Sequence, residues 1–213
     1  MFTLKRTVYV LLGSALFYGG CSSKSEEAVA PTISNEALTS ISLNLTNRAD
    51  VSDKATCKYV YHLNNNGEIT STDSTSLKLK PNAVYDMQIV MLDTTQTPVF
   101  NVSNEVKERS NYHLFFFQPS PVSAANLAFG TTSASIPGTD ASATGPYLNL
   151  TVVRADKDTN SPALQVGLQN VFTTGAASSG KLKVILRHQP NAKNGTFAPG
   201  STDLEANFPV TIQ

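Results

Sequence analysis

Residues 204–212 read LEANFPVTI, and residues 182–188 read LKVILRH. Apolar residues occupy every second position of both stretches, at Leu204, Ala206, Phe208, Val210 and Ile212 and again at Leu182, Val184 and Leu186. A period of two is typical of a β-strand with one buried face. Three earlier stretches, 41–45, 57–62 and 85–91, alternate in the same way.

Turn residues separate the alternating stretches, and they include the hairpin signal Asn64–Gly67. Beyond the N-terminus we expect one short helix at most, within 103–111. Many short strands between turns predict an all-β fold, an antiparallel immunoglobulin-like sandwich over residues 38–213. Residues 118–146, rich in Ser, Thr, Ala, Gly and Pro, predict a long excursion with one short strand near 127–129. The alternative is a linker that divides the domain near 118–146.

The N-terminus has the layout of a lipoprotein signal. Lys5 and Arg6 precede an apolar stretch at 8–18, which is shorter than the roughly twenty residues of a membrane-spanning helix. Two glycines then precede Cys21. We therefore expect residues 1–20 to be cleaved and Cys21 to carry acyl chains such as palmitate, which hold a protein on a membrane. An ordinary secretory signal with an incidental cysteine is the alternative.

Residues 22–37 are small and polar, so 21–37 are expected to form the lipidated end and a flexible tether. The signal holds two of the 16 basic residues and none of the 16 acidic ones, which leaves the cleaved chain near −2. That charge argues against a nucleic-acid partner. If Cys21 is acylated, Cys57 has no partner for a disulfide within the chain.

Several segments resemble a family of small lipoproteins of Bacteroidota, often encoded beside TonB-dependent outer-membrane receptors. The similar segments are Leu79–Tyr85, Val102–Val106, His113–Phe117, Ser179–Pro190, Lys193–Gly195, Gly200–Asp203 and Phe208–Ile212. The resemblance implies an outer-membrane lipoprotein that is accessory to such a receptor, capturing ligand or contacting the receptor, and it implies no reaction. Glu26 and Glu27, after Lys24, resemble an export signal to the cell surface; the periplasmic face is the alternative.

Two of the three histidines are candidate metal ligands. His188 continues the inward row of its strand, and His113 stands at the start of another apolar stretch. If the two strands are neighbours, both imidazoles meet at one rim of the sandwich, where Zn or Cu is the expected metal. Asp203 or Glu108 would add an oxygen ligand. The alternative is that Arg187 and His188 hold the loop that follows them.

Residues 156–160 read DKDTN, and Asp156, Asp158 and Asn160 have the spacing of oxygen ligands for Ca²⁺. A plain hairpin connection is the alternative. The stretch 175–181, GAASSGK, imitates a phosphate-binding loop, but Leu182 replaces the required Ser or Thr and a strand follows. We therefore expect no nucleotide partner and interpret 175–181 as a hairpin loop.

The remaining motifs are shorter. Asp73-Ser74-Thr75 and Asp93-Thr94-Thr95 resemble O-glycosylation acceptors of Bacteroidota, with Ser74 and Thr94 as the modified residues. In Phe115–Phe117 the middle ring must face away from the outer two, so we expect a local cover on both sides, supplied by the 118–146 excursion. No spacing singles out catalytic residues. A surface polysaccharide or polymer hydrolase therefore stays only as an alternative, recognisable by two carboxylates in one pocket.

Overall fold

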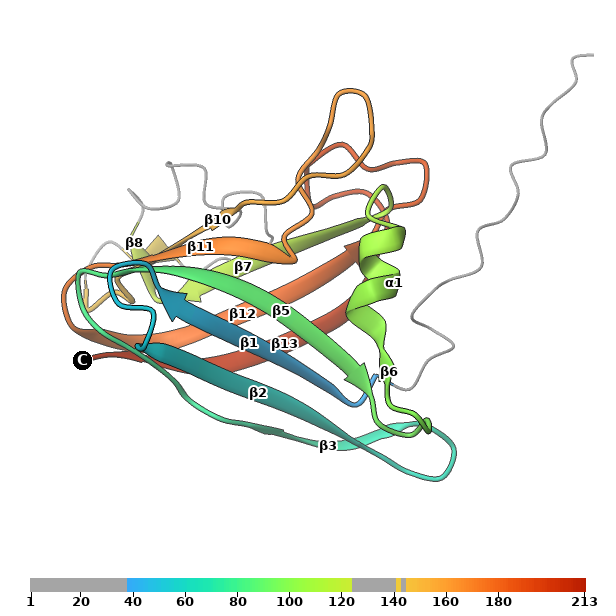
Figure 1. Ribbon diagram of the computed structural model, residues 1–213, viewed down its shortest axis with the longest axis horizontal. Coiled ribbons are helices and arrows are strands. Elements are labelled where there is room, and N and C mark those ends of the chain that lie inside the picture. Colours follow the sequence, from blue (N-terminus) through green and yellow to red (C-terminus); the bar gives the residue numbers. More distant parts are fainter. Residues whose placement is uncertain (1–37, 124–140, 143–144) are drawn as a thin grey trace, which may run out of the picture.

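The computed structural model describes residues 38–123, 141–142 and 145–213. The predicted signal, Cys21, the tether and the strand expected near 127–129 lie outside the described residues. The described chain forms two packed β-sheets with one short helix at one end (Figure 1). The predicted all-β sandwich is thereby confirmed.

The elements follow one another in this order: β1 (Ser40–Asn47), β2 (Lys54–Leu63), β3 (Ile69–Ser74), β4 (Leu77–Leu79), β5 (Val84–Asp93), β6 (Phe100–Asn101), α1 (Val102–Glu108), β7 (His113–Ser120), β8 (Val122–Ser123), β9 (Ala141–Ser142), β10 (Leu150–Arg154), β11 (Gln169–Thr174), β12 (Ser178–His188) and β13 (Ser201–Ile212). The larger sheet has the order β10-β11-β5-β1-β2-β3, and β6 also pairs with β5. The smaller sheet has the order β4-β13-β12-β7. Its β13–β4 pair is parallel, and β8 and β9 form a separate parallel pair.

The alternation found in the sequence becomes the core between the sheets. Inward side chains of β1 and β13 are almost fully buried, as are their partners on β5 and β12. Outward neighbours such as Glu205 are exposed. Burial of each large apolar side chain stabilises a fold by about 1.5–3 kcal/mol, so the register of these strands is strongly specified.

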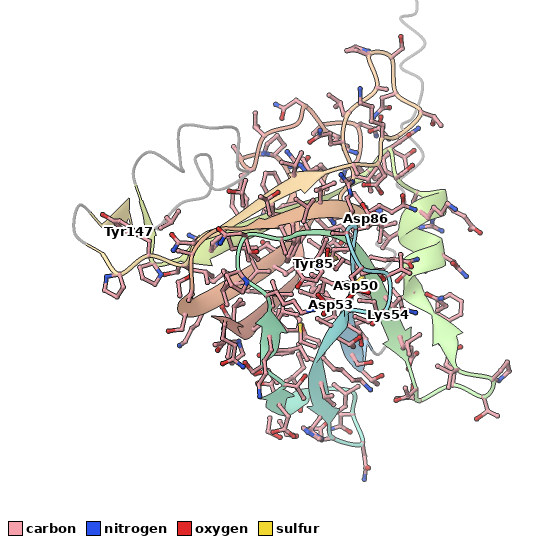
Figure 2. All side chains as sticks on the ribbon, turned by 60° about the vertical axis from the view of Figure 1, so that its left-hand side comes forward. Asp50, Asp53, Lys54, Tyr85, Asp86 and Tyr147 are labelled. Carbon is pink, nitrogen blue, oxygen red and sulfur yellow. The ribbon has the colours of Figure 1, made fainter. Side chains whose placement is uncertain are left out.

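The turn between β1 and β2 is held against β5 by Asp53 (Figure 2). Its Oδ2 accepts hydrogen bonds from Asn47 Nδ2 (2.9 Å) and from the hydroxyl of Tyr85 (3.2 Å), and Lys80 Nζ lies 3.3 Å away. The hydrogen bond from Asn47 is the main cause that lowers the pKa of Asp53. The hydroxyl of the buried Tyr85 is thus satisfied inside a polar corner of the sandwich.

The three phenylalanines of β7 split between two faces of the small sheet, as the sequence predicts. Phe115 and Phe117 join the main core, whereas Phe116 packs with Leu114 and Ile185 on the other face of the small sheet. Among the described residues, Phe116 is covered by Phe197 from the loop after β12, edge-on at 5.2 Å between ring centroids, and by the guanidinium of Arg154, 5.2 Å from the centroid of the Phe116 ring. Most of the 118–146 segment that was expected to supply the cover lies outside the described residues, so that expectation stays a prediction.

The expectation of a hairpin loop at 175–181 is wrong. Residues 178–181 already belong to β12, and β11 and β12 lie in different sheets, so this segment crosses between the two layers. Gly180 packs so closely on β7 that an added Cβ would overlap the carbonyl oxygen of Ser120. Gly180, which belongs to the stretch that resembles a phosphate-binding loop, is thus needed for the close packing of β12 on β7.

Helix α1 is shorter than the stretch 103–111 in which it was expected. The side chain of Asn101 caps it by accepting a hydrogen bond from Ser103 N (3.0 Å), and Val102 and Val106 bury one face. Seven residues give barely two turns, which tertiary packing must stabilise. Within the described ranges, the structure contains no helix with the length and apolarity needed to cross a membrane.

Candidate functional site

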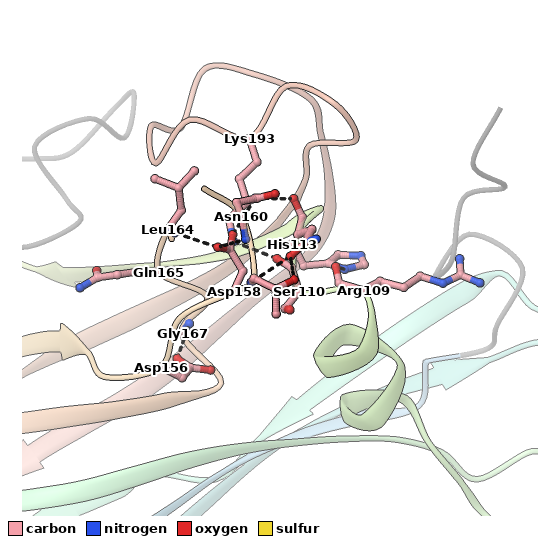
Figure 3. A network of polar contacts seen from close by, with 12 residues as sticks. Arg109, Ser110, His113, Asp156, Asp158, Asn160, Leu164, Gln165, Gly167 and Lys193 are labelled. Carbon is pink, nitrogen blue, oxygen red and sulfur yellow. Dashed lines mark hydrogen bonds and ion pairs between the residues drawn. The ribbon is translucent and has the colours of Figure 1, made fainter. Parts of the chain in front are cut away.

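Three loops close the end of the sandwich beside α1, and we call them the rim loops: 109–112 before β7, 155–168 before β11, and 189–200 before β13. Lys193 ties them together (Figure 3). Its Nζ donates to Asp158 Oδ2 (2.7 Å) and to the carbonyl oxygen of Ser110 (2.9 Å). One buried ammonium group therefore contacts the other two rim loops at once.

The carboxylate of Asp158, a predicted calcium ligand, already accepts hydrogen bonds from groups of the protein. Its Oδ1 accepts hydrogen bonds from the backbone amides of Leu164 (2.8 Å) and Asn160 (3.1 Å), and the Asn160 side chain donates to Oδ2 (2.9 Å). Burial by itself would raise the pKa of Asp158, but the hydrogen bond from Lys193 and these amides outweigh it and lower the pKa. The ammonium of Lys193 supplies the positive charge that the motif was expected to take from Ca²⁺.

Asp156, the second predicted calcium ligand, also makes loop contacts. Its two oxygens accept hydrogen bonds from the backbone amides of Gly167 (2.7 Å) and Leu168 (3.1 Å). The connection is a β10–β11 hairpin, as the alternative expected. In the part of the chain that the structure describes, no three His, Cys, Asp or Glu side chains are arranged to hold a metal ion. The Ca²⁺ site stays a prediction without a converging ligand set.

The two histidines expected at the rim do meet. β7 and β12 are neighbours, and His113 and His188 are opposite each other in their register. Their rings stack with centroids 5.0 Å apart and an angle of 14° between planes. His113 Nδ1 lies 2.9 Å from the carbonyl oxygen of Arg109, so this nitrogen carries the proton and Nε2 is left as an acceptor.

Asp203, rather than the exposed Glu108, lies beside the histidine pair. It is the extra residue of a β-bulge, because Leu186 pairs with Leu204 and Arg187 already pairs with Thr202. Its Oδ2 is 3.8 Å from His113 Nε2, too long for a direct hydrogen bond. Burial raises the pKa of Asp203.

Several polar atoms of this cluster are buried without a partner in the described structure: His113 Nε2, His188 Nε2, Asp203 Oδ2, Arg187 Nε and Gln189 Oε1. Buried polar groups are nearly always satisfied, so such a concentration is unusual. Burial lowers the pKa of His113 to about 4, which keeps its ring neutral at pH 7. The cluster thus combines two imidazoles and one carboxyl group in a site shielded from solvent.

Arg187 shapes the loop after β12, as the alternative interpretation expected, but its companion is Gln189 rather than the expected His188. Its guanidinium donates to Thr202 Oγ1 (2.7 Å) and to the carbonyl oxygen of Pro199 (3.0 Å), and it lies 4.6 Å above the ring of Phe197. Gln189 Nε2 donates to the carbonyl oxygens of Thr196 (2.8 Å) and Pro199 (2.9 Å). One side chain at the end of β12 and one at the start of the loop thereby fix the rim loop 189–200.

The predicted glycosylation residues Ser74 and Thr94 are both exposed. Ser74 ends the edge strand β3, and the hydroxyl of Thr94 lies 3.0 Å from Thr39 Oγ1. Asp73, before Ser74, pairs with the exposed His62 (2.7 Å). Modification at these positions is sterically open and stays a prediction.

Glu105 and Glu108 both line one surface hollow beside α1. Glu105, however, lies 3.5 Å from Arg109 as an (i, i+4) ion pair on the helix.

The chain matches no protein-family model, no curated protein and no solved structure.

Proposed function

We propose that this protein is a lipid-anchored binding protein of the outer membrane, displayed at the cell surface, which serves a TonB-dependent receptor by capturing ligand or contacting the receptor. The observation that carries the proposal is Cys21, placed after a short apolar stretch and before a polar tether. The family resemblance of segments within 79–212 supports the receptor as partner. A sandwich with ordered loops at one end suits a role in recognition.

The position at which β1 begins in the sandwich is consistent with this role. Thr39 N donates to the carbonyl oxygen of Leu92, near the point where β5 pairs with β6, so β1 begins at the end that carries α1 (Figure 1). A tether attached there would hold this end of the sandwich toward the membrane. The rim loops would then lie near the outer face of a membrane receptor.

Lipidation is tested by a Cys21→Ser variant in cells fed an alkyne analogue of palmitate. We expect label on the wild type, no label on the variant, and transfer of the variant from the membrane to the soluble fraction. Cys57→Ala is the matched control, because it removes the other of the two cysteines and should keep the label. An unlabelled wild type with a free thiol at Cys21 would overturn the anchor.

Receptor contact is tested by affinity purification of the tagged protein, expressed at its native level, in mild detergent. We expect a TonB-dependent transporter to be recovered with the wild type and to be depleted with Cys21→Ser. Surface display is measured by protease accessibility on intact cells, with Glu26→Ala/Glu27→Ala as the variant that should reduce it. Recovery of no outer-membrane transporter contradicts the receptor role.

A second candidate function is metal carrying by His113 and His188, and one observation favours it. Both Nε2 atoms are buried without a hydrogen-bond partner, and the carbonyl of Arg109 fixes the ring of His113 with Nε2 unprotonated, as a metal ligand requires. Within the described residues no third His, Cys, Asp or Glu converges with them, so the pair alone is the candidate. Calorimetry with Zn²⁺ and Cu²⁺ on wild type and His113→Ala/His188→Ala decides. Equal weak binding by both proteins ends this candidate.

A further inference from the structure

The carboxylate of Asp158 lies between an amine and an amide (Figure 3). Its Oδ2 accepts hydrogen bonds from Lys193 Nζ (2.7 Å) and from Asn160 Nδ2 (2.9 Å). Asn160 Nδ2 also lies 3.4 Å from the carbonyl oxygen of Asn111. Both partners of this nitrogen are acceptors, so the orientation of the Asn160 amide is settled. One carboxylate oxygen therefore contacts the nitrogen of a lysine amine and the nitrogen that an amide loses when an amine attacks it.

The surroundings of Lys193 favour reaction of its amine. The side chains of Lys193 and Asp158 are 1% and 0% exposed, and Asn160 is half-buried. Burial is the main cause that lowers the pKa of Lys193, and a lower pKa favours the neutral amine that acts as a nucleophile. Exclusion of water also protects an amide bond formed here from hydrolysis.

The side-chain amide of Asn160, rather than the carboxylate of Asp158, is the group that such an amine attacks. Burial by itself would raise the pKa of Asp158, but hydrogen bonds from Lys193 and from backbone amides lower it, so this carboxylate stays ionised. An ionised carboxylate is a poor electrophile, whereas the carbonyl carbon of Asn160 belongs to an uncharged group. Asp158 is instead placed to take a proton from one nitrogen and deliver it to the other.

We propose that Lys193 and Asn160 form an isopeptide bond, with Asp158 as the proton relay between them. A bond forms between Lys193 Nζ and Asn160 Cγ, and the bond between Cγ and Nδ2 of Asn160 breaks. The Lys193 ammonium gives up two of its three protons, and Asp158 passes both to Nδ2, which leaves as an ammonium ion. The reaction consumes no co-reactant, and it does not depend on the lipid anchor or on a receptor.

The isopeptide bond joins two of the rim loops covalently. Lys193 belongs to the 189–200 loop and Asn160 belongs to the 155–168 loop, and the chain between them includes β11 and β12. A covalent link across such a long stretch of chain restricts the unfolded state and thereby raises stability. It also holds both loops in one arrangement at the end of the sandwich.

Peptide mapping by mass spectrometry of the purified full-length protein tests the bond. Trypsin cleaves after lysine and arginine, so an unreacted chain gives the separate peptides 158–181, 188–193 and 194–213. Trypsin does not cleave after an acylated lysine. We therefore expect a branched species, 158–181 joined to 188–213, that is lighter than the sum of its two parts by about 17 Da because ammonia is lost. Fragmentation of this species should place the branch between Lys193 and Asn160.

Two variants separate the bond from the ion pair. Asn160→Ala keeps Lys193 and Asp158 but removes the attacked amide, and Lys193→Arg keeps the positive charge but removes the amine. Both should give only separate peptides and a lower unfolding midpoint than the wild type. Lys183→Arg is the matched control, because Lys183 pairs with Glu205 (2.8 Å) in a half-exposed setting, and it should leave the branched peptide unchanged.

The relay is tested by Asp158→Ala, which should reduce the yield of branched peptide by about tenfold or more. Separate peptides from the wild type, or a branched peptide from Asn160→Ala, would overturn the proposal. A branched wild-type peptide that is lighter by about 18 Da would mean that water is lost, which would place the bond at Asp158 and overturn its assignment as the relay.

Discussion

Lys193 Nζ lies 2.7 Å from Asp158 Oδ2, and the two side chains are only 1% and 0% exposed. The pair joins loops that are 35 residues apart in the chain, and it does so inside the protein rather than on its surface. Loss of one partner from a buried ion pair leaves the other charge buried without compensation. This pair is therefore a buried link between two of the rim loops.

Lys193→Met is expected to lower the free energy of unfolding by about 3–5 kcal/mol, because Asp158 would remain buried as an unpaired carboxylate. Urea denaturation followed by circular dichroism measures this loss. Lys183→Met is the control, because Lys183 makes a pair of similar length with Glu205 (2.8 Å) in a half-exposed setting. Lys183→Met should lower the free energy of unfolding by only about 0–1 kcal/mol. Equal costs in the two variants would contradict a structural role for Lys193.

The buried His113 should make stability depend on pH. Its pKa is lowered to about 4 by burial, whereas an unfolded chain has an ordinary histidine pKa of about 6.5. The unfolded state therefore binds the proton first as pH falls. Above about pH 6.5, protonation of His113 does not reduce the free energy of unfolding. Between about pH 6.5 and 4, proton uptake by the unfolded state lowers that free energy progressively, by about 3 kcal/mol in total.

The measurement compares wild type with His113→Gln by urea denaturation at several pH values. We expect the stability of the wild type to fall more steeply than that of the variant across this window. Asp203, whose pKa is raised by burial, acts in the opposite direction, because its ionisation with rising pH costs stability. Asp203→Asn should therefore steepen the acid-side loss, and parallel curves for all three proteins would refute the assignment.

The fold was predictable because strand periodicity is a local signal. Stretches such as 204–212 alternate over their whole length, and the structure places each as a strand with its apolar face in the core. The crossing at 175–181 was misinterpreted because small residues suit a loop and also suit close strand packing. Only the sheet arrangement shows that Gly180 lies against Ser120.

The candidate site was predictable in part. The places of His113 and His188 at two strand ends predicted that they meet only if the strands are neighbours, and the pairing of β7 with β12 in the structure meets that condition. Lys193 was missed because nothing in its local sequence distinguishes a buried lysine from an exposed one. The bulge that brings Asp203 beside His113 likewise depends on the register between β12 and β13, which no single stretch encodes.

Phe197 should be the residue on which the outer apolar cluster depends. It packs edge-on against Phe116 and lies under the guanidinium of Arg187 at 4.6 Å. Phe197→Ala removes both contacts, and we expect a loss of about 2 kcal/mol in unfolding free energy. It should also expose Leu114 and Ile185, so binding of a hydrophobic dye should rise. Phe197→Leu, which keeps an apolar cover, should show less of both effects.

Substitution of two glycines tests two different effects, steric crowding at Gly180 and backbone conformation at Gly67. Gly180 has no positive φ, but a Cβ there would overlap the Ser120 carbonyl oxygen and lie 3.0 Å from Leu148 Cβ. Gly67 has a φ of +80° in the β2–β3 turn and open space around it. Gly67→Ala should therefore cost about 1–2 kcal/mol from backbone strain alone.

Gly180→Ala should cost more than Gly67→Ala, because the Ser120 carbonyl belongs to the neighbouring strand and can move only if the β7–β12 pairing moves with it. Thermal and urea unfolding of both variants measure the difference. Hydrogen exchange should localise the damage of Gly180→Ala to amides of β7 and β12. A Gly180→Ala protein as stable as Gly67→Ala would show that 178–181 is not packed as a strand.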